Sequence, residues 1–274
     1  MLIVNMDLSI IIPCYNSGYY LKDAIESVLC SKNLNHYRYE IIIINDGSTD
    51  TATINLLAAI EGENCIVLHQ ENAGPAAARN YGIKYATGRY LLFLDSDNKL
   101  RPHFIEKGIS LLDSGNEDIV YGKPGFFGAS TSPRFITGPF NINKIMVQNY
   151  IDICCIMRRE VCTGINGFDE EKRIIGFEDW DLYIRAYAAG FKFLFVDEEV
   201  YDYRIVPGSL SNRHSEEDIR TAYTYIHAKH AWLVSQVLSW YLCEYRTYQF
   251  DRERPLRSCL KYFYKKYTGQ KQAF

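Results

Sequence analysis

Residues Tyr90–Leu100 read YLLFLDSDNKL, an apolar strand that ends in two closely spaced aspartates. Carboxylates repel one another and resist leaving water, so Asp95 and Asp97 beside a buried strand indicate that a cation binds there. The alternative is a polar turn, because Asp, Ser and Asn are common turn residues. This stretch alone does not separate the two interpretations, so the flanking sequence has to decide between them.

The segments before this stretch alternate between strand and helix patterns. Strands are predicted at residues 8–12, 39–44, 65–68 and 90–94, with amphipathic helices between them at 20–31, around 54–60 and from 74 to about 88. The strand YEIIII (39–44) is so uniformly apolar that both of its faces must be covered, as in a parallel sheet. This order predicts an α/β fold with right-handed crossovers.

Three polar clusters each follow a predicted strand: PCYN (13–16), NDGSTD (45–50) and DSD (95–97). In open α/β sheets ligands bind at the carboxyl edge of the strands, and three clusters at that edge favour the metal interpretation over the turn. The glycine pattern of dinucleotide-binding folds and the Walker phosphate loop do not follow the first strand. A divalent ion would therefore have to neutralise any bound phosphate.

The composition is that of an ordinary globular protein, with 274 residues, 47% hydrophobic and 23% charged. This length suits one large domain with or without a helical appendage. The net charge of -3 does not favour nucleic acid as a partner. The eight cysteines form no Cys-x-x-Cys pair, and neither a secretory signal nor a long apolar run is recognisable, so we expect reduced thiols in a cytoplasmic protein without a membrane-spanning helix.

Six motifs in order resemble family 2 glycosyltransferases: IIIPCYN, EIIIINDGSTD, QENAGPAAARN, GRYLLFLDSD, GINGFDEE and GFEDWDL. The resemblance covers residues 8–211. It implies the GT-A fold, a Rossmann-like and mostly parallel sheet flanked by helices, as a catalytic domain over residues 1–214, followed by a C-terminal helical extension over 215–274. It also implies an Asp-x-Asp site for Mn²⁺ or Mg²⁺, a UDP-, GDP- or dTDP-sugar donor, and transfer with inversion.

The resemblance assigns roles to residues of the donor site. Pro13 and Tyr15 would line the nucleobase pocket beside Asn16, and Asp46 would hydrogen-bond the base. Arg79 would lie near the nucleoside, Asp95 would face the ribose or the metal, and Asp97 would be the principal metal ligand. The alternatives are a packing role for Tyr15, a turn role for Asp46 and a surface charge for Arg79. Family members often carry another acid after this motif, where this chain has Asn98 and Lys99.

The second half supplies the candidates for the catalytic base. Glu178 and Asp179 open a predicted helix, where the helix dipole favours ionised acids, so a purely structural role is the alternative. The resemblance implies that Asp179 is the general base and that Glu178 shapes the acceptor site. Trp180 is either a platform for a sugar or a core residue, and Asp152 would approach the sugar.

The segment YDYRIVPGSLSNRHSEE (201–217) resembles the loop that closes over the diphosphate. It offers three candidates for a positive charge or, for His214, a metal contact: Arg204, Arg213 and His214. The sequence alone does not choose among them.

The C-terminal region has two distinct patterns. An apolar stripe from Ile219 to Trp240 predicts one long amphipathic helix. Beyond it, residues 252–271 contain seven Lys or Arg and a single Glu, interleaved with aromatic residues. This mixture suits a peripheral contact with the inner face of a membrane, a helix docked on the catalytic domain, or a homodimer contact.

The residues and the resemblance together predict a metal-dependent, inverting glycosyltransferase. It would move a sugar from a nucleotide-sugar donor, most readily a UDP-sugar, to a hydroxyl of a glycan or lipid-linked acceptor in surface polysaccharide biosynthesis. One rival is a sugar-phosphate nucleotidyltransferase, which is disfavoured because a glycine- and lysine-rich loop does not follow the first strand. The other is a non-catalytic sugar-nucleotide-binding subunit, whose motifs we would expect to be broken.

Overall fold

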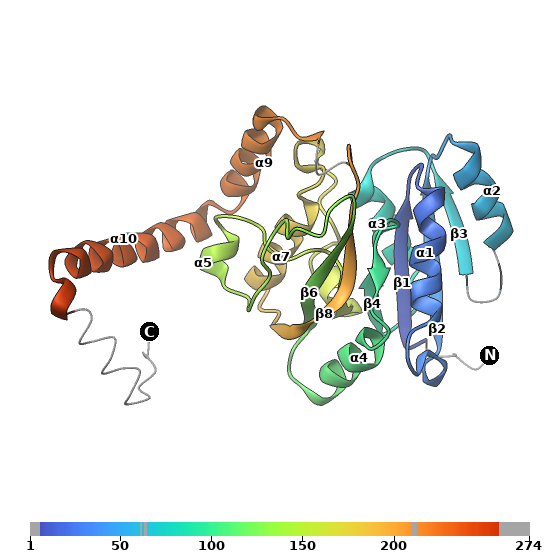
Figure 1. Cartoon of the computed structure of the whole chain (residues 1–274), viewed down its shortest axis with the longest axis horizontal. Helices are drawn as coiled ribbons and strands as arrows, with labels where there is room; N and C mark the ends of the chain where they lie inside the picture. Colours follow the sequence, from blue (N-terminus) through green and yellow to red (C-terminus); the bar gives the residue numbers. More distant parts are fainter. Residues whose placement is uncertain (1–5, 61, 63–64, 210–212, 258–274) are drawn as a thin grey trace. The chain divides into compact units, whose positions relative to one another are not determined.

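A computed structural model describes residues 6–60, 62, 65–209 and 213–257 (Figure 1). The chain divides into two compact units, residues 1–229 and residues 230–274. The first unit contains the sheet and every element from β1 to α9, and the second contains helix α10 (Ala231–Glu253). The assignment of residues 1–214 to a catalytic domain and of 215–274 to an extension stays a prediction.

One half of the sheet is parallel, as the strand and helix order predicts. Its strands are β1 (Leu8–Cys14), β2 (Tyr39–Asp46), β3 (Cys65–Gln70) and β4 (Tyr90–Phe93), in the spatial order β3-β2-β1-β4. The four isoleucines of β2, Ile41–Ile44, are almost completely buried, which confirms that both faces of this strand are covered.

The other half of the sheet is mixed. It continues from β4 through β7 (Cys155–Arg158), β6 (Ile119–Gly128), β8 (Phe193–Ile205) and β5 (Lys99–Leu100). Strand β7 runs antiparallel to both β4 and β6. Strands β6 and β8 run parallel to each other (Figure 1). The antiparallel β7 brings the segment before it, which contains Asp152, to the same edge as the carboxyl end of β4.

Helices connect the strands and cover the sheet. They are α1 (Gly18–Leu29), α2 (Thr51–Ile60), α3 (Pro75–Tyr85), α4 (Phe104–Ser114), α5 (Ile142–Ile145), α6 (Arg159–Gly164), α7 (Glu178–Ala188) and α9 (Glu216–Lys229), with 3₁₀ turns η1 (Leu34–His36) and η2 (Lys172–Ile174). Asp50 caps α2, since its Oδ1 accepts a hydrogen bond from the Thr53 amide at 2.8 Å.

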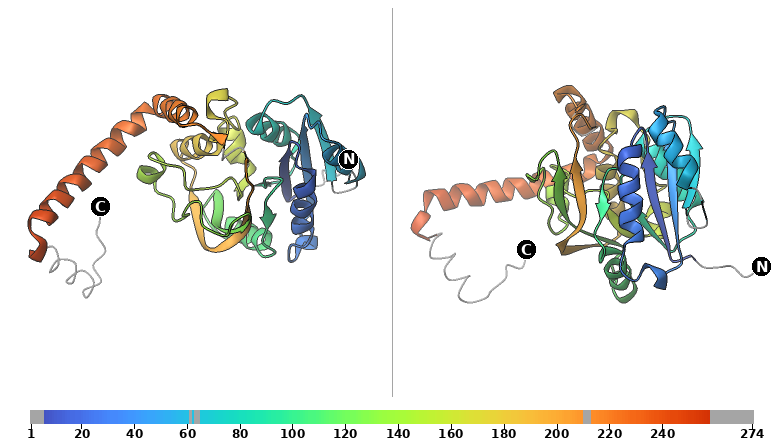
Figure 2. Two further views of the ribbon diagram at one scale, coloured as in Figure 1. Left: turned by 45° about the horizontal axis from the view of Figure 1, so that its top comes forward. Right: turned by 45° about the vertical axis from the view of Figure 1, so that its right-hand side comes forward.

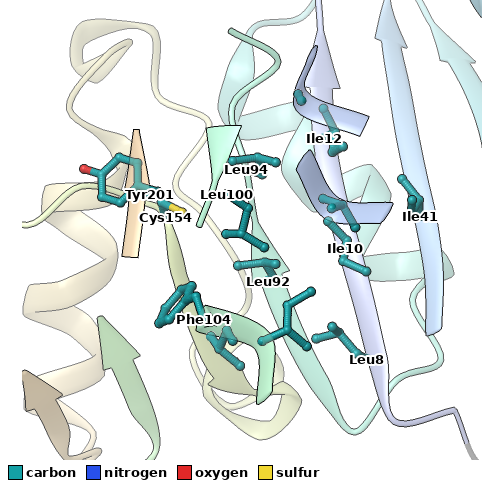
Figure 3. Close-up of a cluster of buried hydrophobic side chains, with 14 of the residues drawn as sticks. Leu8, Ile10, Ile12, Ile41, Leu92, Leu94, Leu100, Phe104, Cys154 and Tyr201 are labelled. Atoms are coloured by element: carbon teal, nitrogen blue, oxygen red, sulfur yellow. The ribbon is translucent and has the colours of Figure 1, made fainter. Parts of the chain in front are cut away.

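A hydrophobic core lies between one face of the sheet and helices α1 and α4. Alternate residues of β1 and β2 point into it, including Ile10, Ile12 and Ile41 (Figure 3). Helix α1 lies alongside β1 in both views of Figure 2. Helix α3 packs on the other face through Gly82, where a β-carbon would lie 2.6 Å from Ile11 Cγ2 and 2.8 Å from Ile44 Cδ1.

The C-terminal stripe forms two helices instead of the single long helix that its spacing predicts. α9 ends at Lys229 and α10 begins at Ala231, with His230 between them in a non-helical conformation. Much of the basic and aromatic segment, from residue 258 onward, lies outside the described residues. Among the helices that the structure does describe, none combines the length and apolar character required to cross a bilayer.

Candidate active site

A cavity of about 930 Å³ opens where β1, β2 and β4 end. The segment before β7, the first turn of α7 and the residues after β8 complete its walls. Most of the candidate residues predicted from the sequence line it: Pro13, Tyr15, Asn16, Asp46, Arg79, Asp95, Asp97, Asp152, Glu178 and Asp179. Motifs that are far apart in the sequence therefore meet at one site, as expected for the carboxyl edge of an α/β sheet.

Asn16 connects the loops that follow β1 and β2. It has a positive φ of 50°, and its side-chain oxygen accepts hydrogen bonds from the amides of Thr49 at 2.7 Å and Asp50 at 3.1 Å. Its own amide donates to the hydroxyl of Ser48 at 3.0 Å. These bonds hold the neighbouring Tyr15, whose side chain is half exposed, at the wall of the cavity.

Asp46 organises the start of α3. Its carboxylate accepts hydrogen bonds from the Gln70 side chain at 2.7 Å and from the amides of Ala73 at 2.8 Å and Gly74 at 2.9 Å. Its backbone carbonyl accepts another from Asn72. Asp46 thus lines the cavity as expected. Its carboxylate also holds the backbone that leads into α3, a contact that its position before Gly47 did not indicate.

Arg79 is buried between two acids that come from distant parts of the chain. It donates to Glu178 Oε1 at 2.6 Å and to Asp95 Oδ1 at 2.7 Å, and its guanidinium lies over the ring of Phe168. Burial lowers the pKa of Arg79, but these two carboxylates outweigh burial and hold that pKa above its ordinary value. The interpretation of Arg79 as a surface charge is therefore wrong.

Glu178 uses both of its carboxylate oxygens inside the protein. One accepts from Arg79, and the other accepts from the Gly176 amide at 2.6 Å. Its side chain is only 6% exposed. Glu178 therefore holds the beginning of α7 against α3, which places Asp179 in the wall of the cavity.

Asn98 and Arg204 hold the DSD turn (95–97) in place through hydrogen bonds. Asn98 is buried, and its side-chain oxygen accepts a hydrogen bond from the Arg204 amide at 2.9 Å. The Arg204 guanidinium donates to the Asp97 carbonyl at 2.8 Å and to the Asp23 carboxylate at 2.6 Å. Arg204 therefore supports the turn, while Arg213 is the arginine of the 201–217 segment that lines the cavity.

Three acids of the cavity have raised pKa values. Burial and the charge of Asp95 raise the pKa of Asp97 to about 6, and the same two causes raise the pKa of Asp152 to about 7. Burial, followed by the charges of Glu178 and Asp152, holds the pKa of Asp179 well above its ordinary range. Burial outweighs the stabilising effect of the α7 N-terminus on an ionised Asp179.

The donor set fits a hard divalent cation. Six carboxylates line the cavity, those of Asp46, Asp95, Asp97, Asp152, Glu178 and Asp179, and Arg79 is buried between two of them. Within the described part of the chain, no three His, Cys, Asp or Glu side chains are arranged as a metal site of their own. Mg²⁺ and Mn²⁺ do not require one, because they commonly take one or two carboxylates and complete their coordination with water and substrate phosphates.

Two residues predicted for the site do not line the cavity. Trp180 is completely buried, donates its indole N–H to the Ile145 carbonyl at 2.5 Å and packs against Tyr223, so it is a core residue and not a platform for a sugar. His214 packs near Phe177, and a β-carbon on Gly176 would lie only 2.5 Å from its Nε2. His214 therefore packs against the turn that precedes Asp179.

The comparisons with known proteins agree with this architecture. The sequence profile of glycosyl transferase family 2 matches residues 9–165, more than half of the chain, and a profile described as the N-terminal domain of galactosyltransferase matches residues 144–207. A structure of S. aureus TarS 1-349 in complex with UDP-GlcNAc superposes with a TM-score of 0.66 at 20% identity, covering 79% of this chain and 64% of that one.

Curated relatives include proteins of different lengths. The minor teichoic acid biosynthesis protein GgaB of Bacillus subtilis is 30% identical over 217 residues, which are 73% of this chain and only 23% of GgaB. Glycosyltransferase GlyG of Streptococcus pneumoniae is 29% identical over 224 residues, which are 74% of this chain and 72% of GlyG. The expected GT-A fold and family are thereby confirmed: the chain belongs to glycosyl transferase family 2.

Proposed function

We propose that the chain is a metal-dependent, inverting glycosyltransferase that moves a sugar from a UDP-sugar to a hydroxyl of a glycan or lipid-linked acceptor in surface polysaccharide biosynthesis. The observation that carries the proposal is the cluster of Asp95, Asp97, Asp152 and Asp179 in one cavity at the carboxyl edge of the sheet. The UDP-GlcNAc bound in the TarS structure supports the donor class, and the teichoic acid biosynthesis named for GgaB supports a role in the synthesis of a surface polymer.

Asp97 and Asp95 are the residues that would hold the ion. Both line the cavity, and the charge of Asp95 contributes to the raised pKa of Asp97, so a cation between them would relieve their repulsion. When bound, Mn²⁺ or Mg²⁺ supplies charge neutralisation for the departing diphosphate. Within the 201–217 segment, Arg213 lines the cavity and would add a positive charge at the same site.

Asp179 would act as the general base. The acceptor hydroxyl oxygen forms a bond to the anomeric carbon, its proton passes to the Asp179 carboxylate, and the bond from that carbon to the diphosphate oxygen breaks. Attack from the face opposite the leaving diphosphate inverts the anomeric configuration. The raised pKa of Asp179 suits this task, since a general base works best when its pKa approaches the operating pH.

The test of the donor site is a thermal-shift and donor-hydrolysis panel. UDP-, GDP- and dTDP-sugars are each measured with Mn²⁺, Mg²⁺ or EDTA. We expect UDP-sugars to raise the melting temperature only when metal is present and to release UDP slowly. If no nucleotide shifts the protein under any metal condition, the cavity is not a donor site and the proposal fails.

Three variants separate the proposed roles. Asp97→Asn is expected to abolish the metal-dependent shift, and Asp179→Asn to abolish transfer while leaving the shift intact. Asp197→Asn is the matched control, because Asp197 is exposed and pairs with Lys123 on the surface. Loss of donor binding in Asp179→Asn would argue that Asp179 is a structural acid.

We also propose that residues 215–274 are an extension that contacts an anionic membrane surface. The exposed Tyr245 and Tyr248 of α10 and the basic residues that follow support this contact. Co-sedimentation with phosphatidylglycerol vesicles, but not with phosphatidylcholine vesicles, is the expected result. A stable dimer in solution without vesicle binding would assign the segment to self-association instead.

A further inference from the structure

Three aromatic rings cluster on the far half of the sheet from the proposed nucleotide pocket. Phe126 of β6 and Tyr203 of β8 are partners in the strand register, with ring centroids 5.8 Å apart. Phe135, from the loop after β6, packs edge-on against both, at 5.5 Å from Phe126 and 5.7 Å from Tyr203. We call Phe126, Phe135 and Tyr203 the aromatic wall.

The aromatic wall forms part of the cavity. Phe135 and Tyr203 line the cavity directly, and the ring of Phe126 packs against both of them. The loop that carries Phe135 is fixed at its far end, where the Tyr121 hydroxyl donates to the Gly138 carbonyl at 2.8 Å and the Tyr150 hydroxyl donates to the Pro139 carbonyl at 3.0 Å. The rings are therefore held in place before any ligand arrives, which reduces the entropy lost on binding.

The order of the strands separates the aromatic wall from the nucleotide pocket. Pro13 and Asp46 lie on β1 and β2, whereas the wall lies on β6 and β8, with β4 and β7 between them. Asp152, in the segment before β7, and Asp179 line the space in between. A donor with its base on β1 and β2 and its diphosphate near β4 leaves the wall for the other substrate.

The aromatic wall also lies at an open part of the cavity. Ile136, next to Phe135, is 87% exposed, and residues 131–134 are exposed as well. An acceptor that belongs to a longer chain must extend out of the site into solvent, so it requires a binding surface at such a rim. A nucleotide sugar has no such requirement.

We propose that the aromatic wall binds a pyranose ring of the acceptor and so selects acceptors that present a sugar over those that present only a polyol phosphate. This inference rests on the proposed function and names the acceptor class of the same site. The face of an aromatic ring is electron-rich, and the C–H groups on the apolar face of a pyranose are its natural partners. A linear polyol phosphate offers no comparable flat apolar face and would meet several carboxylates in this cavity.

The test uses the full chain saturated with UDP and Mg²⁺, which is diamagnetic and leaves the NMR signals of the ligands sharp. Saturation-transfer NMR measures binding of methyl β-glucopyranoside, methyl N-acetyl-β-glucosaminide and glycerol 3-phosphate. We expect transfer to the ring protons of at least one glycoside and none to glycerol 3-phosphate. Donor hydrolysis is measured in parallel, so that failure of the donor site itself is distinguishable from failure of this inference.

Two leucine variants distinguish aromatic stacking from simple apolar contact. Phe135→Leu and Tyr203→Leu are each expected to weaken glycoside binding by about tenfold, while the UDP-sugar KM for hydrolysis stays within about twofold. Tyr203→Phe should retain glycoside binding, and Ile136→Ala is the matched control on the same loop. Melting temperatures identify any variant that fails to fold, in which case the other leucine variant decides.

Three results would overturn the proposal. One is unchanged glycoside binding in both leucine variants, and another is binding of glycerol 3-phosphate in place of the glycosides. The third is a rise in the UDP-sugar KM of the leucine variants, which would place the rings against the donor sugar.

Discussion

Glu178→Gln is the substitution that tests most directly how the site is built. Glutamine keeps the shape of the side chain but loses its charge, and it replaces one of two accepting oxygens with a donor. The wild-type oxygens accept from Arg79 and from the Gly176 amide, both at 2.6 Å. In the variant, only one of these two donors can keep its partner.

The expected loss of stability follows from the burial of this pair. The Arg79 and Glu178 side chains are 5% and 6% exposed, so the donor that loses its partner remains away from water, although Arg79 keeps its pair with Asp95. We expect a decrease of about 2–4 kcal/mol in the free energy of unfolding. The control is Glu171→Gln, whose arginine partner is half exposed, and which should unfold close to wild type.

The same substitution should shift the pH dependence of transfer. After burial, the charge of Glu178 is the largest cause of the raised pKa of Asp179. Removing that charge lowers the pKa of Asp179, so the base stays ionised at lower pH. The acidic limb of the pH profile of kcat should therefore move to lower pH.

Urea unfolding and pH–rate profiles of wild type, Glu178→Gln and Glu171→Gln measure both effects. If Glu178→Gln unfolds like the Glu171→Gln control, the buried pair does not hold α7. If its acidic limb stays in place or moves to higher pH, Asp179 is not the titrating base, or Glu178 does not act on it.

Three further outcomes are expected. Asp152 has a pKa of about 7 in the folded protein, above its unfolded value of about 4. Ionised Asp152 therefore destabilises the fold increasingly as pH rises from about 4 to 7. Asp152→Asn should raise the melting temperature more at pH 7.5 than at pH 4.5. Lys229 pairs with the buried Asp181 at 2.9 Å and with Asp169 at 2.6 Å. Because Asp181 keeps its pair with Arg185 at 2.6 Å, Lys229→Met should cost about 1–3 kcal/mol in urea unfolding. Because the pKa of Asp97 is about 6, the stabilisation of the UDP complex by Mn²⁺ should weaken between pH 7 and pH 5 in calorimetric titrations.

The sequence predicts the parallel half of the sheet well because local pattern and tertiary environment agree there. The run YEIIII is apolar on both faces, and β2 is buried on both faces. Pro13 was expected to end the first strand, yet β1 continues to Cys14. The C-terminal stripe was less informative, since its spacing continues through His230 although the helix stops there.

The sequence predicted which residues form the site, but it did not predict which of them contact one another. The motifs identified the residues that line the cavity. Those after β1, β2 and β4 follow strands at the same edge, whereas Arg79, Asp152 and the two acids of α7 were assigned by the family resemblance. The pairing of Arg79 with Glu178 joins residues 99 positions apart, and no local pattern reports such a contact. Trp180 shows the converse, since a tryptophan beside two acids reads equally as a platform or a core residue until its burial is known.

The question raised by the two aspartates of DSD has a physical answer in the structure. Its backbone does form a turn, because the Asn98 amide donates to the Asp95 carbonyl at 3.0 Å. If the DSD motif were only a turn, its carboxylates would remain in water, where their ionisation does not destabilise the fold. Here the pKa of Asp97 is raised by burial and by Asp95, and Asp152 and Asp179 share this unfavourable environment. Acids that destabilise the fold and gather in one cavity are better explained by a positively charged ligand than by the stability of the turn.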